Sequence, residues 1–185
     1  VGTASVPSGA STGKYEAVEL RDELKSYHGK GVTKAIDNID NDIKNIILGR
    51  SPLEQTKIDN DLISLDGTSN KKKLGANAIL GASMAVARAG AISLNQPLYR
   101  YIGGISSKVM PVPLMNIING GAHANNSLEI QEFMIRPDGA KSFKECMQIS
   151  FLTIQTLKKN LEKKKISTNV GDEGGFAPSL KSDEE

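Results

Sequence analysis

A large excess of charge of one sign is missing from this sequence. Its 23 Lys and Arg residues stand against 21 Asp and Glu residues, which leaves a formal net charge of +2. Nucleic acids and anionic membranes select strongly basic surfaces, so the overall charge indicates neither kind of partner. A disulfide within the chain is also excluded, because Cys146 is the single cysteine. That agrees with a reducing compartment.

A secretory leader and an apolar run long enough to be a convincing membrane span are absent from the residues given. The longest weakly polar stretch, residues 74–94, approaches spanning length but is rich in Ala and Gly and contains Asn77 and Arg88. We therefore expect it to be a tightly packed helix of a soluble protein. The first residue is Val1 rather than Met, so we expect the sequence to be an incomplete gene product.

What is present has the composition of an ordinary globular protein. Hydrophobic residues make up 38% and charged residues 24% of the 185 residues, enough to bury a core in one large or two small domains. Pro111-Val112-Pro113 is stiff and cannot continue a helix, which suits a linker. We therefore place a domain boundary near Lys108, giving segments 1–108 and 109–185.

Two amphipathic helices are expected early in the first segment. Between Thr33 and Leu48 the isoleucines recur at helical spacing, and Gly49 follows as a C-cap. Ser51-Pro52 has the pattern of an N-cap with proline at the first helical position, and the helix that it opens should end before Asp66-Gly67.

A third helix is expected at residues 74–94 and should form the buried centre of the first segment, because its small residues let other backbones approach. Asn95-Gln96-Pro97 ends it. Residues 1–6 are expected to form the end of a strand. The basic run at residues 70–73 lacks interleaved aromatic residues, so we interpret it as a solvated loop and not as a binding site.

The second segment should open with two short strands, at residues 114–118 and 130–135. Turn-forming residues lie between them, at 119–121 and 125–127. Ser142 and Glu145 then have the spacing of a capping box, which predicts a helix running to about Lys163 with Cys146 on its apolar face. Further along we expect a strand at residues 166–170 and the first turn of a helix at 182–185.

The loop between the two predicted strands carries His123, one of two histidines in the chain, and the second strand carries Gln131 and Glu132. Loops held by a rigid frame often form active sites. Neighbouring residues of a regular strand point to opposite faces, so Gln131 and Glu132 can share a pocket only at a strand end or a bulge. On spacing alone, a structural role for His123 is as good an interpretation as a catalytic one.

Glu132 and Glu173 are the candidate acid–base residues. Moving a proton to or from a weakly acidic centre needs a group of tuned pKa within hydrogen-bonding reach, and two nearby carboxylates can share a proton. Taken singly, each glutamate is more typical of a solvated surface charge. Only their occurrence together with other motifs favours catalysis.

A glycine-rich loop at residues 8–13, SGASTG, invites comparison with the phosphate-binding P-loop. The comparison fails, because Gly9 and Gly13 are separated by three residues rather than four and Tyr15 follows Lys14 where Ser or Thr should stand. From composition alone a surface turn is the better interpretation. A phosphate-binding NTPase is thus a weakened alternative.

Four blocks together resemble the enolase family. They read SGASTG at 8–13, LGANAILG at 74–81, NIINGGAHANN at 116–126 followed by QEFMI at 131–135, and NVGDEGG at 169–175. The blocks occur in the family's order and extend across nearly the whole chain, and several are too long and unusual for chance to explain them.

The resemblance implies a role for each matching residue. Glu173 would be the acid that helps to expel the C3 hydroxyl of 2-phosphoglycerate as water. Glu132 would be its partner and, with Gln131, would line the substrate and water end of the pocket. His123 would hydrogen-bond the substrate, and Ser11, on a mobile lid, would reach a magnesium ion.

The resemblance also shows what these residues lack. Enolases remove the C2 proton with a lysine and stabilise the enediolate with Mg²⁺ held by carboxylates of later barrel strands. Neither the lysine nor those carboxylates have a counterpart before Glu185. Ser11 alone cannot bind Mg²⁺ usefully, because this hard cation needs several oxygen ligands. We therefore expect this chain by itself to be inactive.

The implied fold is an α+β N-terminal domain, here lacking its start, followed by the first ββα part of a β/α barrel of the TIM type. The implied activity is glycolytic phosphopyruvate hydratase, which reversibly dehydrates 2-phospho-D-glycerate to phosphoenolpyruvate with Mg²⁺. The implied form is a cytoplasmic homodimer with no nucleic-acid or membrane partner. The alternative from another class is a non-catalytic binding or structural protein on an enolase scaffold.

Overall fold

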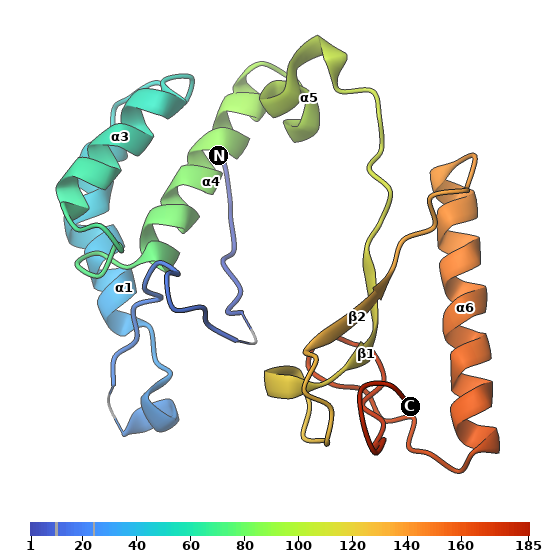
Figure 1. Ribbon diagram of the computed structural model, residues 1–185. Helices are drawn as coiled ribbons and strands as arrows, with labels where there is room; N and C mark the ends of the chain where they lie inside the picture. The colour runs from blue at the N-terminus through green and yellow to red at the C-terminus, as the bar shows by residue number, and fades with distance from the viewer. Residues whose placement is uncertain (10, 24) are drawn as a thin grey trace. The chain divides into compact units, whose positions relative to one another are not determined.

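The computed structural model describes residues 1–9, 11–23 and 25–185. They divide into two units, Val1–Ser8 with Thr12–Lys108 and Gly9–Ser11 with Val109–Glu185. The first unit contains the helices drawn in blue and green in Figure 1, and the second contains those elements drawn from yellow to red.

Helices make up the regular structure described in the first unit. In chain order they are η1 (Ser26–Gly29), α1 (Thr33–Asn38), η2 (Ile39–Ile43), α2 (Lys44–Ile47), α3 (Gln55–Asp66), α4 (Ala76–Ser93), α5 (Leu98–Gly103) and η3 (Gly104–Ser106).

The elements α1, η2 and α2 form one continuous helical run, with a single π-type turn at its centre. This confirms the helix predicted from the isoleucine spacing. Its end also follows the prediction, since Leu48 turns to extended geometry and Gly49 takes a left-handed φ of 78°.

The predicted start of the next helix is wrong. Helix α3 begins at Gln55 rather than at Pro52, because the residues from Ser51 onward first close a separate turn. In that turn the backbone N–H of Glu54 donates to the carbonyl of Ser51 at 3.1 Å. The C-terminal end agrees with the sequence, since Gly67 has the left-handed φ of 67° that a glycine cap supplies.

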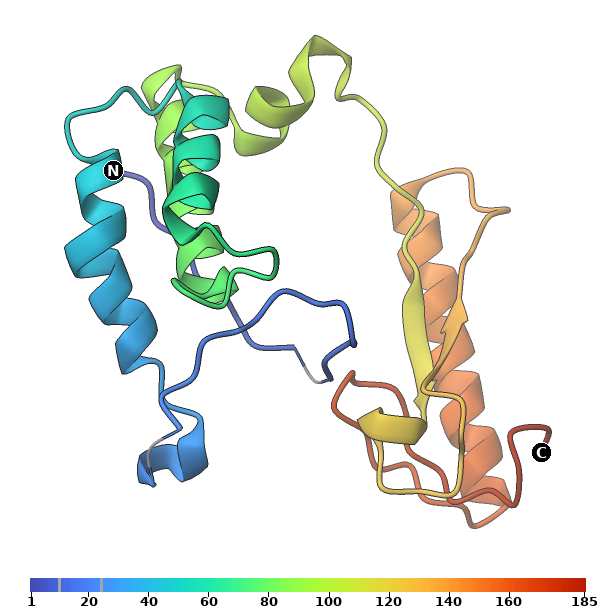
Figure 2. The same ribbon diagram turned by 60° about the vertical axis from the view of Figure 1, so that its left-hand side comes forward.

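Helix α4 is the centre of the first unit, as predicted. It lies beside α3 and the α1–α2 run in both Figure 1 and Figure 2. Small residues dominate its buried face, which allows this close packing. The core of the unit comprises Ala35, Ile43, Ile58, Leu62, Leu74, Ala78, Ala82 and Val86.

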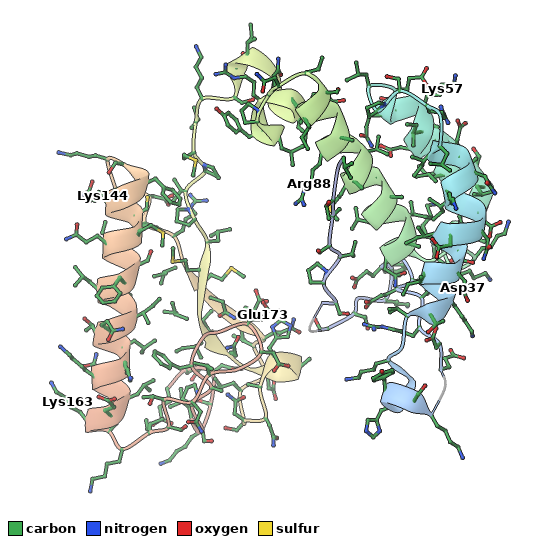
Figure 3. All side chains as sticks on the ribbon, turned by 180° about the vertical axis from the view of Figure 1, so that it is seen from behind. Asp37, Lys57, Arg88, Lys144, Lys163 and Glu173 are labelled. Carbon is green, nitrogen blue, oxygen red and sulfur yellow. The ribbon has the colours of Figure 1, made fainter. Side chains whose placement is uncertain are left out.

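The strand end predicted at residues 1–6 is wrong. The segment is described without secondary structure, and it lies along α4, where Arg88 donates a 2.6 Å hydrogen bond to the carbonyl of Thr3 (Figure 3). A strand needs a neighbouring strand to supply its ladder of hydrogen bonds. The described residues of this unit contain no such neighbour.

Across the described ranges, no single helix has both the length and the apolar character needed to cross a bilayer. Only α4 and the α5–η3 segment taken together pass that test by length and composition, and they are bent by 96° relative to each other.

The second unit contains an antiparallel hairpin and one long helix. Strand β1 (Met115–Asn119) pairs with β2 (Glu132–Ile135), and the register shifts at a bulge between Asn116 and Ile118. The short turn η4 (Gly121–His123) follows β1. Helix α6 (Phe143–Lys163) runs beside the hairpin in Figures 1 and 2. The predicted strand–strand–helix order is confirmed.

The predicted pair Ser142 and Glu145 caps the start of α6, but the carboxylate of Glu145 bonds the residue before the N-cap and not the N-cap itself. Ser142 Oγ accepts a hydrogen bond from the backbone N–H of Glu145 at 3.2 Å, and the carboxylate of Glu145 accepts one from the N–H of Lys141 at 2.7 Å. The helix ends at Lys163, which is labelled in Figure 3. Cys146 is 4% exposed on the buried face, so its assignment as a core residue is confirmed.

Near the end of the chain, one prediction is wrong and another agrees with the structure. Residues 166–170 form no strand, because Val170 makes only an isolated bridge with Phe176. Residues 182–185 form the predicted turn, in which the N–H of Glu185 donates to the carbonyl of Ser182 at 3.3 Å. The partner of β1 in this region is instead Phe176, which makes a parallel bridge with Ile118. The glycine-rich turn before Phe176 therefore brings the next piece of extended chain onto the free edge of β1.

Candidate functional site

A tight loop at the end of β1 positions His123. Backbone N–H groups of Gly120 and Gly121 donate to the carbonyls of Gln131 and Leu128 at 3.0 and 2.8 Å, which closes the loop on itself. The N–H of His123 donates to Gly120 at 3.0 Å. These bonds hold an imidazole that is only 3% exposed.

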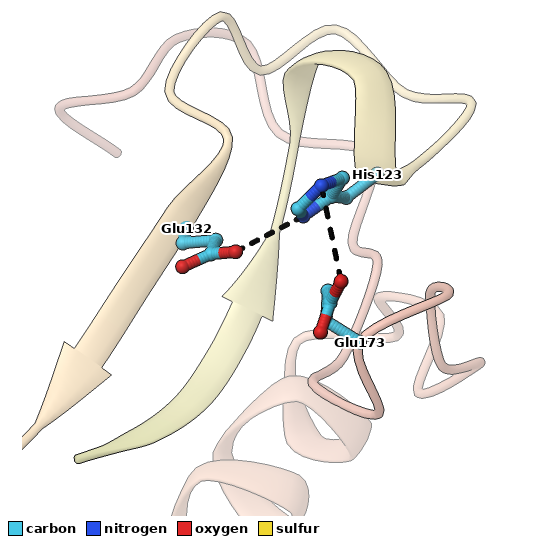
Figure 4. A group of neighbouring side chains, drawn as sticks. All are labelled: His123, Glu132 and Glu173. Atoms are coloured by element: carbon cyan, nitrogen blue, oxygen red, sulfur yellow. Dashed lines mark ion pairs between the residues drawn. The ribbon is translucent and has the colours of Figure 1, made fainter. Parts of the chain in front are cut away.

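Two carboxylates flank this imidazole (Figure 4). Glu132 Oε1 lies 3.2 Å from His123 Nδ1, and Glu173 Oε1 lies 3.9 Å from His123 Nε2. One glutamate begins β2 and the other stands on the glycine-rich turn after α6, far away in the sequence. The structure therefore brings together the two glutamates that the sequence singles out.

Gln131 and Glu132 lie at a strand end, as their shared orientation requires. Strand β2 begins at Glu132, and Gln131 precedes it outside the ladder. Gln131 Nε2 approaches His123 Nε2 to 2.8 Å. With the amide placed in this way Gln131 donates, so Nε2 is the acceptor and the ring proton is assigned to Nδ1, on the side of Glu132.

Ser11 completes the group of predicted residues. Its Oγ lies 3.1 Å from His123 Nε2 and accepts from Gln131 Nε2 at 3.4 Å. The preceding residue of the SGASTG block, Ala10, lies outside the described residues. No helix begins in described residues 11–23, whereas a P-loop runs directly into a helix, so the NTPase alternative is weakened further.

The turn that carries Glu173 is tied to the histidine loop. The N–H of Asp172 donates to the carbonyl of His123 at 3.2 Å, and the N–H of Gly171 closes the turn on the carbonyl of Gly175 at 2.8 Å. The side chain of Glu173 is 40% exposed. Its carboxylate is therefore held near His123 but remains accessible to a ligand.

His123, Glu132 and Glu173 form a group that could hold a metal ion, since one ligand atom from each lies within 4.8 Å of the others. One imidazole and two carboxylates suit zinc or another transition metal. Magnesium prefers six oxygen ligands in near-octahedral geometry. The hydroxyl of Ser11 faces the imidazole instead, so this cluster by itself does not fit a resident Mg²⁺.

Cavity size does not locate this site. A cavity of about 610 Å³ lies in the first unit, and its lining of mostly apolar residues includes Ile43, Ile58 and Ala82 but none of the five predicted site residues. It contains no convergent set of acid–base groups of the kind described above.

Asn119 is the residue at this site that the sequence analysis missed. Its place in the sequence indicates only a turn former, yet it is fully buried and its side chain donates to the carbonyl of Gly175 at 2.6 Å. The one signal in the sequence was its place at the junction of an apolar run and a glycine pair. That pattern indicates a strand end but not the contact across 56 residues.

Comparison with known proteins gives matches over nearly the whole chain. Residues 1–102 match the family model for the enolase N-terminal domain, and residues 107–185 match that for the enolase C-terminal TIM barrel domain. The chain is also 57% identical over 183 residues to a protein named Enolase from Ehrlichia ruminantium (strain Welgevonden). That match covers 98% of this chain and 44% of the relative, so the chain spans less than half of the relative's length.

Proposed function

This chain belongs to the enolase family, and from that premise we propose that the protein catalyses the glycolytic dehydration of 2-phospho-D-glycerate to phosphoenolpyruvate and its reverse. The observation that carries the proposal is the convergence of Glu132 and Glu173 on the buried imidazole of His123. A group of this kind can hold and deliver protons beside an acidic phosphorylated substrate.

Family membership confirms the predicted fold class, an enolase N-terminal domain followed by the start of the barrel domain. We propose that the boundary between them lies near Lys108, so that residues 1–108 belong to the first and 109–185 to the second. The end of the first structural unit at Lys108, if the short loop Gly9–Ser11 is set aside, supports this placement.

Each site residue has a proposed role. Glu173, the more exposed carboxylate, protonates the C3 hydroxyl as it leaves, because it can reach a ligand while Asp172 holds its turn against the His123 backbone. Glu132 is its partner and orients the imidazole through Nδ1. Gln131 hydrogen-bonds the substrate or the departing water as a donor, and His123 does so as an acceptor through Nε2, since these two nitrogen atoms lie 2.8 Å apart.

Magnesium enters the proposal through the family. When bound, it would supply positive charge to stabilise negative charge developing on the substrate. Ser11 is the one proposed ligand in this chain, through its oxygen atoms. The remaining oxygen ligands and the lysine base would have to come from groups other than those that surround His123.

The cellular setting is likewise proposed from the family: a cytoplasmic homodimer that acts on a small molecule. The net charge of +2 agrees with a protein without a nucleic-acid or membrane partner. The rival proposal, a non-catalytic binding or structural protein, uses the same scaffold and differs only in the absence of turnover.

The test is formation of phosphoenolpyruvate from 2-phospho-D-glycerate by the protein expressed from its complete reading frame, with Mg²⁺ present. Glu173→Gln removes the proton donor and should lower kcat by about 100-fold or more. Glu129→Gln is the matched control, because Glu129 is exposed in the neighbouring loop, and it should leave kcat unchanged.

The outcomes separate the rivals. Turnover that depends on Glu173 but not on Glu129 supports the enzyme. Binding of phosphoenolpyruvate without turnover supports the non-catalytic scaffold, and binding of ATP would restore the NTPase alternative.

A further inference from the structure

We propose that Asn119 is a positioning residue, which holds the turn carrying Glu173 at the correct place relative to His123 and Glu132. The inference rests on the proposed function for its catalytic consequence, but its structural content stands independently. Asn119 itself does not touch the imidazole or the two carboxylates through any described hydrogen bond, so it acts through the turn.

Asn119 is fully buried and each of its polar groups is hydrogen-bonded. Its backbone N–H donates to Phe176 at 2.8 Å, and its Nδ2 donates to the carbonyl of Gly175 at 2.6 Å. Its carbonyl accepts from Asn126 Nδ2 at 2.9 Å, and its Oδ1 accepts from Asn116 Nδ2. Satisfying every group in this way leaves the side chain one orientation.

The same residue touches the structures that carry both glutamates. In the hairpin, Asn119 is the direct partner of Glu132. Its side chain bonds the carbonyl of Gly175, which is two residues after Glu173 in the sequence. A displacement of Asn119 would therefore change the spacing between the two carboxylates.

Close packing reinforces the hydrogen bond. A Cβ atom on Gly171 would lie 2.7 Å from Asn119 Nδ2 and 2.7 Å from the carbonyl oxygen of His123. A Cβ atom on Gly175 would lie 2.8 Å from the backbone of Ile117. Gly171 and Gly175, the two ends of the Glu173 turn, are therefore in close contact with Asn119 or with the backbone of β1, and a residue with a Cβ atom does not fit at either position.

The position of Asn119 requires an amide side chain. Asn119 must donate toward Gly175 and accept from Asn116 with one planar head, which a carboxylate cannot do because it only accepts. An apolar residue would leave the carbonyl of Gly175 buried without this donor, which is unfavourable. Asn119→Asp therefore changes the chemistry with almost no change of volume.

The first experiment is a double-mutant cycle on the protein from its complete reading frame. Asn119→Asp should lower kcat by about 10- to 100-fold, because displacement of a catalytic group by about 1 Å has effects of that size. KM should change by less than about threefold, since substrate contacts remain. In the Glu173→Gln background the same substitution should add less than about twofold. Asn125→Asp, an identical change at an exposed position of the loop that follows β1, should have no effect.

Equal losses from Asn119→Asp in both backgrounds would overturn the proposal, because they would show a general structural effect. If Asn119→Asp does not fold, Gly171→Ala separates the turn from Asn119 by steric contact while residue 119 keeps its amide. It should produce the same loss of kcat that depends on Glu173, and an unchanged kcat would equally overturn the proposal.

A second measurement does not require turnover. Amide hydrogen exchange at Asp172, Gly174 and Phe176 should become about tenfold faster in Asn119→Asp, while the amides of α6 keep their wild-type rates. Unchanged exchange at the turn overturns the positioning role even in an active enzyme. If the wild-type protein forms no phosphoenolpyruvate but exchange at the turn is faster in Asn119→Asp, the proposed function is rejected and the positioning role stands.

Discussion

At the scale of single residues, the site depends on one buried imidazole with polar side chains beside both of its ring nitrogens. Glu132 approaches one ring nitrogen, while Gln131 and Ser11 approach the other. Nδ1 is buried without an aligned hydrogen bond among the described atoms, although Glu132 lies 3.2 Å away. A bound ligand that shifts either side chain slightly could therefore improve that contact.

Asp66 gives a prediction about stability at this scale. It is 2% exposed, and its carboxylate accepts from the N–H groups of Thr68 and Leu74 at 2.9 and 2.8 Å and from the Thr68 hydroxyl. Burial raises the pKa of Asp66, but these hydrogen bonds outweigh it and the net pKa lies below the ordinary 3.8. Asp66→Asn should lower the free energy of unfolding by about 1–3 kcal/mol at neutral pH, because an amide cannot accept at both oxygens.

The pH dependence follows from the lowered pKa. Below 3.8 the unfolded state takes up protons on Asp66 before the folded state does. Its contribution to stability is therefore complete above that pH and is lost as the pH falls through the lower folded pKa. Denaturant titrations of wild type and Asp66→Asn between neutral and acid pH should converge at low pH, and a difference that grows with acid would contradict this account.

The residue scale also shows what the sequence could predict. The sequence singles out five residues because they lie in unusual motifs, and the structure places all five together. They are Ser11, His123, Gln131, Glu132 and Glu173. Asn119 was missed because its importance comes from burial and from a partner distant in the sequence, neither of which has a local signal.

At the scale of elements, local periodicity predicted the helices well. The run Thr33–Ile47, helix α4 and helix α6 each follow a repeat of apolar or small residues together with a residue pattern that marks one end of the helix. Strand predictions were less accurate near the chain ends, because a strand exists only where a partner supplies its hydrogen bonds. The segments 1–6 and 166–170 have the composition of strands without such a ladder.

Helix α1 has a start that its own sequence does not supply. Its N-cap residue, Val32, offers no side-chain hydrogen bond, and Asp22 instead accepts from the N–H groups of Thr33 and Lys34 at 2.9 and 2.8 Å. The hydrogen bond from Lys34 is the main cause of the lowered pKa of Asp22. A capping group from outside the helix thus fixes where it begins.

Gly31→Ala tests this arrangement. An added Cβ would lie 2.4 Å from Asp22 Oδ2, so the carboxylate must move away from the helix start. We expect a lower thermal midpoint and faster amide exchange at Thr33 and Lys34, with α6 unaffected. Gly139→Ala is the control, because a Cβ there would meet nothing within 4 Å, and an equal loss in both variants would exclude the capping explanation.

At the scale of the whole molecule, the chain carries one side of a proposed reaction centre. Its described cluster supplies proton-transfer groups and one hydroxyl, while the family chemistry also needs a lysine base and a set of oxygen ligands for magnesium. The sequence indicates the need for a lysine base and further oxygen ligands only through the family resemblance, because no local pattern specifies the additional groups that a reaction requires.

The corresponding prediction concerns the 185-residue chain alone. Purified and supplied with 2-phospho-D-glycerate and Mg²⁺, it should form no measurable phosphoenolpyruvate, whereas the protein from the complete reading frame should be active under the same conditions. Circular dichroism of the isolated chain would show whether helices are present, so that inactivity is not confused with unfolding. Measurable magnesium-dependent turnover by the isolated chain would show that these residues suffice.

The bulge in β1 changes which segment its backbone bonds. Side chains alternate from face to face along a strand, so an inserted or deleted residue normally reverses every position beyond it. Here the unpaired residue between Asn116 and Ile118 separates two stretches of regular pairing. The carbonyl of Ile117 instead accepts from the N–H of Phe176 at 2.9 Å, so the break in the pairing with β2 coincides with the attachment of the extended segment that follows the Glu173 turn.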